Sequence, residues 1–139
     1  MRFFILLPLA IFLSSCGEDL VSRTEPDIYH KWILDQIKSH ESKVILTNTD
    51  REYQFIVFER PDKVFVNAGC NYGEGTFSLE NGLSVSCPTT MMLCRSEAVM
   101  GREEIFTGNL FFAEDYCIQD SRLTIQTTYV YDLIFRLAD

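Results

Sequence analysis

Short runs of β-branched and aromatic residues, separated by turn signals, recur along most of residues 53–137. Such runs are typical of strands, and Arg60-Pro61-Asp62 marks a turn between the first two of them. Asn81-Gly82 favours the positive φ angles of a tight hairpin, and Thr128-Tyr129 lies near the turn of a last hairpin. The predicted strands are 53–58, 63–68, 76–79, 83–86, 122–127 and 130–137, with 32–37 and 43–46 as weaker candidates.

The segment 96–112 has a helical pattern instead. Ser96 stands where an N-cap is expected, acidic residues follow early, and apolar residues recur at helical spacing, which indicates core contacts rather than a ligand site. Gly101 and Gly108 each cost about 1 kcal/mol relative to Ala, so this helix needs tertiary packing. We therefore expect one α+β domain, mainly antiparallel β in a small barrel-like or curled sheet, with one amphipathic helix. The positions at helical spacing are Val99, Arg102/Glu103, Phe106 and Leu110.

The N-terminus indicates export. Met1-Arg2 is followed by an apolar run from Phe3 to Leu13, which is too short for a membrane anchor and fits a signal peptide. Leu13-Ser14-Ser15-Cys16 resembles the bacterial lipobox, which implies cleavage before Cys16 and its acylation; an ordinary secretory signal with an incidental Cys is the alternative. We predict a lipoprotein signal peptide over 1–15, a lipidated Cys16 with a tether over 16–27, and a domain over 28–139.

The tether and the charge bear on location and partners. Gly17 rather than Asp follows Cys16, which favours an outer-membrane lipoprotein facing the periplasm, held to the membrane through its lipid. The chain has 12 Lys and Arg against 20 Asp and Glu, a net charge of -8. That acidity argues against a nucleic-acid partner, which requires a basic face, and leaves an unidentified envelope protein as the expected partner.

Four cysteines remain after Cys16: Cys70, Cys87, Cys94 and Cys117. An even number in an exported chain indicates disulfides, and sequence alone allows three pairings. A metal site is disfavoured, because there is no Cys-x-x-Cys pair and both histidines are distant in sequence. We therefore expect neither a metal nor a cofactor.

No catalytic arrangement is evident, so we predict that the protein is not an enzyme. His30 and His40 are the only histidines, and no Ser lies in a nucleophile elbow. Glu103-Glu104 and Asp115 are more simply solvated carboxylates than a glycosidase pair. Gly73-Glu74-Gly75 lacks the helix and Lys of a phosphate loop.

Asn71 allows two interpretations. Its amide can hold a loop by bonding nearby backbone, as in an Asx turn, which we favour, or it can form an interaction surface with Tyr72 and Thr90. Met91-Met92-Leu93 is similarly open: alternation puts at least one side chain in the core, whereas an exposed Met can serve as an adaptable contact.

Three blocks of sequence resemble the META-domain family, and in particular its heat-shock lipoproteins of the HslJ type. They are Gly69-Cys70-Asn71 leading through Gly73–Gly75 to a strand at 77–79 and the Asn81-Gly82 turn, Thr90–Cys94 followed by the helix, and the hairpin 123–125 with 133–139. The loop after Cys70 is about two residues shorter than the family pattern, and Met91 stands where Arg is common.

The resemblance implies a β-fold without a defined reaction and a role in envelope stress, heat shock and tolerance of hydrophobic antibiotics. It also implies a Cys70–Cys94 disulfide, which would leave Cys87 to pair with Cys117. The alternative function is an acidic inhibitor or binder of a basic periplasmic hydrolase such as lysozyme, which the charge would steer.

Overall fold

A computed structural model describes residues 26–41, 43–47, 54–94 and 96–139 of the chain. In this part of the chain, nine strands form one antiparallel sheet in the order β6-β5-β4-β3-β1-β9-β8-β7, and β2 pairs with β1 beside that path. The helix α1 (Glu97–Leu110) lies between β6 and β7 in sequence. The strands are β1 (Lys31–Ser39), β2 (Val44–Thr47), β3 (Phe55–Glu59), β4 (Lys63–Asn67), β5 (Tyr72–Ser78), β6 (Ser84–Ser86), β7 (Ala113–Gln119), β8 (Arg122–Thr127) and β9 (Tyr131–Leu137).

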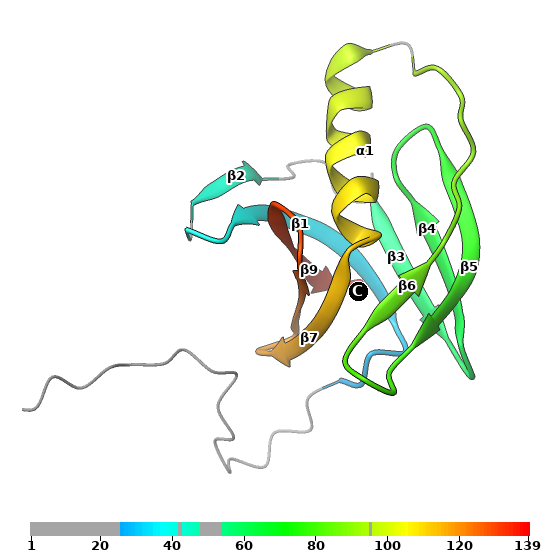
Figure 1. Ribbon diagram of the computed structural model, residues 1–139, viewed down its shortest axis with the longest axis vertical. Helices are drawn as coiled ribbons and strands as arrows, with labels where there is room; N and C mark the ends of the chain where they lie inside the picture. The colour runs from blue at the N-terminus through cyan, green and yellow to red at the C-terminus, as the bar shows by residue number, and fades with distance from the viewer. Residues whose placement is uncertain (1–25, 42, 48–53, 95) are drawn as a thin grey trace, which may run out of the picture.

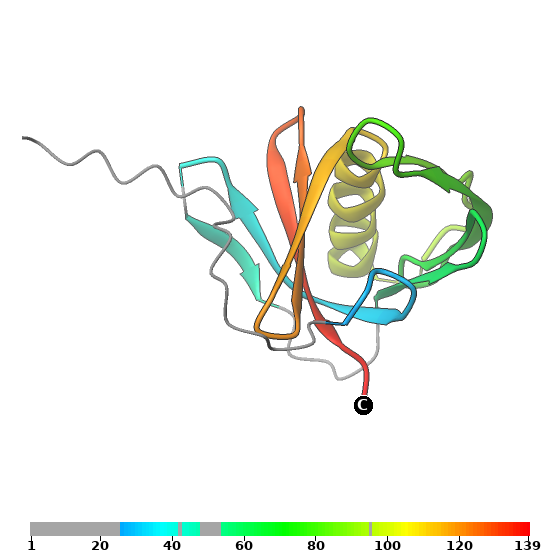
Figure 2. The same cartoon turned by 90° about the horizontal axis from the view of Figure 1, so that it is seen from below.

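The sheet curls around α1 and almost closes into a barrel. Seen from below, β3 to β6 lie on one side of the helix and β7 to β9 on the other (Figures 1 and 2). The two ends of the strand order approach each other where the Leu83 N–H donates to the Glu114 carbonyl at 2.8 Å. The expected fold, a mainly antiparallel β-domain with a curled sheet and one helix, is therefore confirmed.

The core lies between the helix and the inner face of the sheet. Large side chains from the helix and several strands are fully buried there, among them Trp32, Phe58, Phe106 and Phe135. The Phe106 ring of α1 meets Phe135 of β9 at 5.9 Å between centroids, and the Trp32 indole N–H donates to the Ile28 carbonyl at 2.9 Å. Apolar burial on this inner face, with the one indole N–H satisfied, is what holds the helix against the sheet.

Most of the predicted elements are present, with two differences. The helix spans Glu97–Leu110 with Ser96 at its N-cap position, although the Ser96 side chain makes no cap hydrogen bond. Its buried face is half polar, because Glu103 and Asn109 are buried beside Phe106 and Leu110. The second difference is β7, which the sequence pattern did not predict.

The N-terminal predictions lie outside the described residues: the signal peptide, Cys16 and the tether up to residue 25. Within the part of the chain that the structure describes, no helix is long and apolar enough to cross a membrane.

Candidate functional site

A disulfide between Cys70 and Cys94 ties the loop after β4 to the segment that leads into α1. The two Cα atoms are 5.8 Å apart, within the usual range for a disulfide. The pairing is the one that the family resemblance implied. It fixes the segment between β6 and α1 to the sheet at a point where no strand pairing would hold it.

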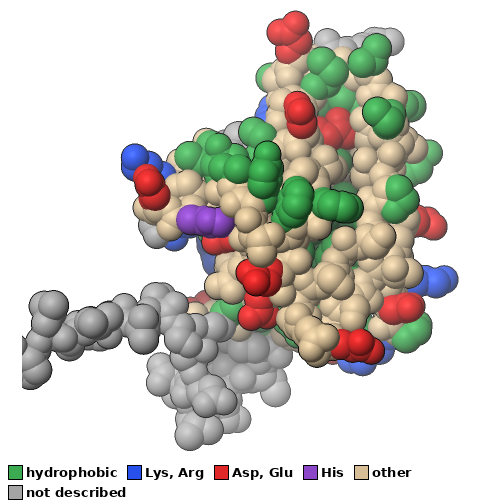
Figure 3. Space-filling model, viewed as in Figure 1, with side chains coloured by type: hydrophobic (Ala, Val, Ile, Leu, Met, Phe, Trp, Pro, Cys, Tyr) green, Lys and Arg blue, Asp and Glu red, His purple; other side chains and the backbone are tan. Residues whose placement is uncertain are grey.

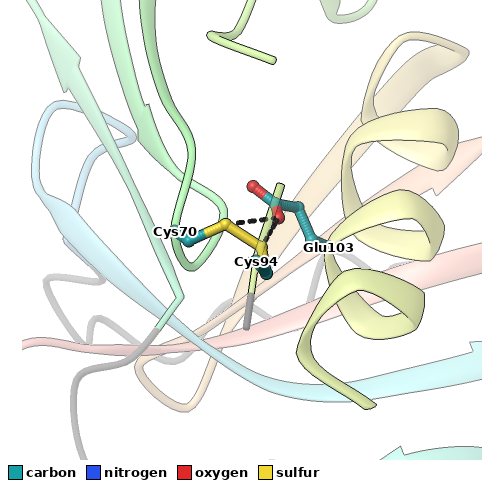
Figure 4. A group of neighbouring side chains, drawn as sticks. All are labelled: Cys70, Cys94 and Glu103. Atoms are coloured by element: carbon teal, nitrogen blue, oxygen red, sulfur yellow. Dashed lines mark hydrogen bonds between the residues drawn. A yellow bond between two sulfur atoms is a disulfide. The ribbon is translucent and has the colours of Figure 1, made fainter. Parts of the chain in front are cut away.

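Glu103 of α1 points at this disulfide (Figure 4). Its side chain is buried, with Oε2 3.0 Å from Cys94 Sγ and 3.5 Å from Cys70 Sγ, while Oε1 accepts the Asn71 N–H at 2.9 Å. The three side chains have the spacing of a metal-ligand group. A disulfide supplies no thiolate, however, so in this oxidised form the group cannot act as a thiolate metal site.

Asn71 holds the neighbouring segment in place by its side-chain amide. Oδ1 accepts from the Thr90 hydroxyl at 2.8 Å and from the Met92 N–H at 2.7 Å, and Nδ2 donates to the Met92 carbonyl at 3.0 Å. The residue is buried. Its role is therefore structural, but the bonds reach a segment about twenty residues away rather than the local backbone of an Asx turn, and the amide is not available to an outside partner.

The side chains that this scaffold presents to solvent are apolar. Met91 is 98% exposed, Leu93 91%, Met92 59% and Tyr72 54%. Thr90 is exposed as well, and its N–H donates to the Tyr72 carbonyl at 2.9 Å. We call residues 90–93 together with Tyr72 the apolar ridge; contrary to one expectation, none of Met91, Met92 and Leu93 belongs to the core.

A shallow hollow of about 300 Å³ separates the apolar ridge from α1, where Met100 and Glu104 form the opposite wall. In the space-filling view, hydrophobic side chains gather along the segment between β6 and α1, and also over β2 and the C-terminal end of the helix (Figure 3). Phe112, which follows α1, and Tyr129, between β8 and β9, are both exposed, and their rings stack at 4.9 Å between centroids. Exposed apolar groups at this density are typical of interaction surfaces.

The other residues considered for chemistry are not brought together in the described part of the chain. His30 Nε2 lies 3.4 Å from Asp27 Oδ1, and His40 Nε2 lies 3.3 Å from Asp132 Oδ1; both histidines are exposed, and Asp132 is half-buried. Glu103 points into the disulfide cluster, whereas the adjacent Glu104 is exposed. The carboxylates are thus not arranged as a facing pair across one cleft.

The expected disulfide between Cys87 and Cys117 is wrong, because Cys87 is a free thiol. Cys87 packs against the core, and its thiol contacts the backbone of Val66 on β4. Cys117 lies on β7, opposite Thr124 of β8. The Cys87 side chain packs against the core, and its burial raises the pKa of the Cys87 thiol above the ordinary value.

The family model for the META domain matches residues 26–139, which is the whole domain including every element described above. The chain belongs to the META-domain family. A search of curated proteins finds no match. As a META-domain protein, the chain has the β-sheet and single helix that its sequence blocks implied.

Solved structures show the same fold at low identity. A protein from Burkholderia xenovorans, determined by NMR, is 14% identical with a TM-score of 0.65, over 88% of this chain and 95% of that one. A second NMR structure is 20% identical with a TM-score of 0.58, over 80% and 91%. A crystal structure of a DUF4847 family protein from Bacteroides vulgatus is 12% identical with a TM-score of 0.56, over 81% and 96%. These similarities concern the fold alone.

Proposed function

We propose that this META-domain protein is a lipid-anchored envelope protein whose domain is a non-catalytic binding module, contributing to tolerance of heat and of hydrophobic antibiotics. The observation that carries the binding role is the apolar ridge. Met91 and Leu93 expose nearly their whole side chains to water, so neither gains the free energy of burial in the free protein. Neighbouring exposed apolar side chains of this size are typical of surfaces that bind a partner.

The rigidity of the apolar ridge supports the same role. The Cys70–Cys94 disulfide closes one end of the segment, and the buried Asn71 amide makes three hydrogen bonds to its middle. A surface ordered before binding loses less conformational entropy when a partner docks. Met side chains then adapt to the partner's shape while the backbone stays fixed.

The anchoring part of the proposal comes from the sequence. A lipid on Cys16 would hold the domain at the outer membrane, within reach of envelope proteins exposed to the periplasm. Metabolic labelling with an alkyne palmitate analogue tests it: the wild-type chain should be labelled and fractionate with membranes, and Cys16→Ser should lose both properties. Labelling of Cys16→Ser at the wild-type level would refute the lipid anchor.

The binding role is tested by capture from solubilised envelope with two matched double variants. Met91→Ser/Leu93→Ser removes the two most exposed side chains of the apolar ridge, and Val44→Ser/Ile45→Ser removes two half-exposed apolar side chains from β2. We expect a partner that is lost with the first variant and kept with the second, at both low and high salt. A partner lost equally with both variants would refute the assignment to the ridge.

The same assay separates the alternative function. A basic hydrolase held by the acidic surface would be captured at low salt only and would be insensitive to both double variants. For the stress role, a deletion strain should lose growth under heat and hydrophobic antibiotics. Wild-type chain should restore that growth, and Met91→Ser/Leu93→Ser should not.

A further inference from the structure

A second hollow lies next to the first, between α1 and the same preceding segment, and Thr89 and Thr107 line both. It has a volume of about 250 Å³ and opens between the C-terminal half of α1 and the residues that follow β6. Its walls are mainly apolar, with the Cys87 thiol among them. The lining includes Val66, Val85, Cys87, Gly108, Leu110 and Phe111.

Two glycines of β5 allow one wall of this cavity to form. A Cβ on Gly75 would overlap the Ser86 carbonyl oxygen, and a Cβ on Gly73 would overlap the Pro88 carbonyl oxygen. Only residues without a side chain let the backbone at 86–88 lie this close to β5. The Gly73-Glu74-Gly75 motif, which did not fit a phosphate loop, therefore positions the wall that carries Cys87.

A third glycine keeps the opposite wall open. Gly108 lies within α1, where Gly is about 1 kcal/mol less favourable than Ala. A Cβ at this position would have no neighbouring atom within 4 Å, so packing does not require Gly here. The missing side chain leaves space, and at Gly108 that space is part of the cavity.

The electrostatic setting favours an uncharged occupant. Burial, and to a smaller extent the charge of Glu74, raise the pKa of Cys87, while a hydrogen bond with the Val66 backbone lowers it less. The thiol is therefore neutral at pH 7. An anion would additionally be repelled by the charge of Glu74, which also acts on Cys87, and by the net charge of -8 on the chain.

We propose that this cavity binds a small uncharged aromatic molecule, with its ring between Gly108 of the helix and the thiol of Cys87. A rigid ring loses little conformational entropy on binding, and it gains apolar burial against Val66, Val85 and Leu110. Sulfur at Cys87 makes favourable contacts with aromatic rings, and Phe111 at the rim adds an aromatic neighbour. The site is separate from the apolar ridge and does not depend on the proposed function.

Indole is the probe, and Cys87 itself reports on occupancy. The full chain is treated with methyl methanethiosulfonate, which converts the Cys87 thiol to a methyl disulfide and releases methanesulfinate. Modification of the Cys87 peptide is followed by mass spectrometry with and without indole. At ten times the dissociation constant the free fraction is about one in eleven, so the rate should fall about tenfold. No slowing up to the solubility limit of indole would overturn the proposal.

Two leucine variants on the same helix make the test specific. Gly108→Leu fills the cavity and should abolish the effect of indole on the Cys87 rate. Gly101→Leu is the matched control, because Gly101 also has open space at its Cβ but is exposed and does not line the cavity; it should keep the wild-type response. An unchanged indole effect in Gly108→Leu would overturn the site.

A variant-independent measurement covers the case in which Gly108→Leu does not fold. Amide chemical shifts of the wild-type chain titrated with indole should change at 66, 85–89 and 107–111 and remain constant on β8 and β9. Shifts spread over the whole domain would overturn the site. Slowing by hexanol without slowing by indole would overturn the aromatic assignment.

Discussion

Replacing Asn71 with alanine is expected to lower the free energy of unfolding by about 2–4 kcal/mol. The side chain makes three hydrogen bonds to residues 90–92, and each is worth about 0.5–1.5 kcal/mol net. The bonds to Met92 use both the N–H and the carbonyl of one peptide residue. Loss of the amide leaves these groups without their partners, so the expected cost lies above the lowest value that three such bonds would give.

Asn71→Asp separates the contribution of the Nδ2 donor to stability from that of the Oδ1 acceptor. Aspartate keeps an oxygen that can accept from the Thr90 hydroxyl and the Met92 N–H. It replaces the Nδ2 donor with a second oxygen facing the Met92 carbonyl, and it adds a negative charge close to the buried Glu103. We therefore expect Asn71→Asp to be at least as destabilising as Asn71→Ala at pH 7, although it is nearly isosteric with the native residue.

The assay is urea unfolding of the oxidised chain followed by circular dichroism. Asn67→Ala is the matched control, because the Asn67 side chain accepts a single hydrogen bond, from the Gly69 N–H at 3.0 Å. It should cost about 0.5–1.5 kcal/mol. If Asn71→Ala and Asn67→Ala lower the free energy of unfolding equally, the argument that three Asn71 hydrogen bonds hold residues 90–92 in place is refuted.

Three further changes test other parts of the structure. Opening the Cys70–Cys94 disulfide with a Cys70→Ser/Cys94→Ser variant should cost about 3 kcal/mol in urea unfolding, since 24 residues separate the two positions; a cost below 1 kcal/mol would contradict the role as a fixed clamp. Cys87 should react with iodoacetamide more slowly at pH 8 than a cysteine of the unfolded chain, because its raised pKa favours the neutral thiol. The stability linked to this raised pKa is present below pH 9.0 and is lost as the pH rises through the pKa of the folded chain. A reaction faster than in the unfolded chain would refute the burial of Cys87. Ser121→Gly should raise stability by about 0.5–1 kcal/mol in thermal unfolding, because Ser121 has a positive φ of 58°; a loss of stability would show that its side chain matters more than its backbone angle.

The hairpins were predictable where the local signals agree with the tertiary structure. The turn Arg60-Pro61-Asp62 joins β3 to β4, and β8 and β9 lie where period-two alternation placed them. One of the two weaker candidates, 32–37, became β1, which pairs with both β3 and β9 at the middle of the sheet. Its position comes from long-range pairing, which a local pattern does not contain.

The Asn81-Gly82 turn shows why local signals alone are insufficient. Asn81-Gly82 was expected to form a tight hairpin, but Ser78 pairs with Ser84, so five residues separate β5 from β6. Gly82 does have a positive φ of 85°, yet its Cβ position is occupied by the Glu114 carbonyl of β7. Packing against another strand, rather than a two-residue turn, requires this glycine.

The actual two-residue turn has no glycine and was missed, together with the strand before it. Gln119 pairs with Arg122, and both intervening residues, Asp120 and Ser121, have positive φ angles. Asp tolerates this conformation better than most residues, but Asp-Ser is a weak turn signal. With no recognisable turn after it, and with only weak alternation of burial, β7 was not separable from a loop.

The disulfide site was only partly predictable, because some of its contacts join segments that are distant in the sequence. The disulfide pairing followed from the family resemblance, and Asn71 was singled out by its position beside Cys70. That Glu103 faces inward could not be read from the sequence, because helical spacing alone did not distinguish a buried carboxylate from the solvated Glu104 beside it. Its partners are the Asn71 N–H and the two sulfurs, which lie on other segments of the chain.

Glycine positions explain why the proposed cavity site leaves so little trace in the sequence. A catalytic site requires side chains of particular chemistry, which a motif can capture. The cavity beside α1 instead depends on side chains that are absent at Gly73, Gly75 and Gly108, each for a separate steric reason. Gly101 shows how weak that signal is, because it has the same residue type and the same open Cβ position on the same helix but lines no part of the cavity. The two glycines differ only in that α1 packs against the 85–89 segment at Gly108. The comparison of Gly108→Leu with Gly101→Leu therefore tests a site that depends on this tertiary packing, which the sequence pattern does not contain.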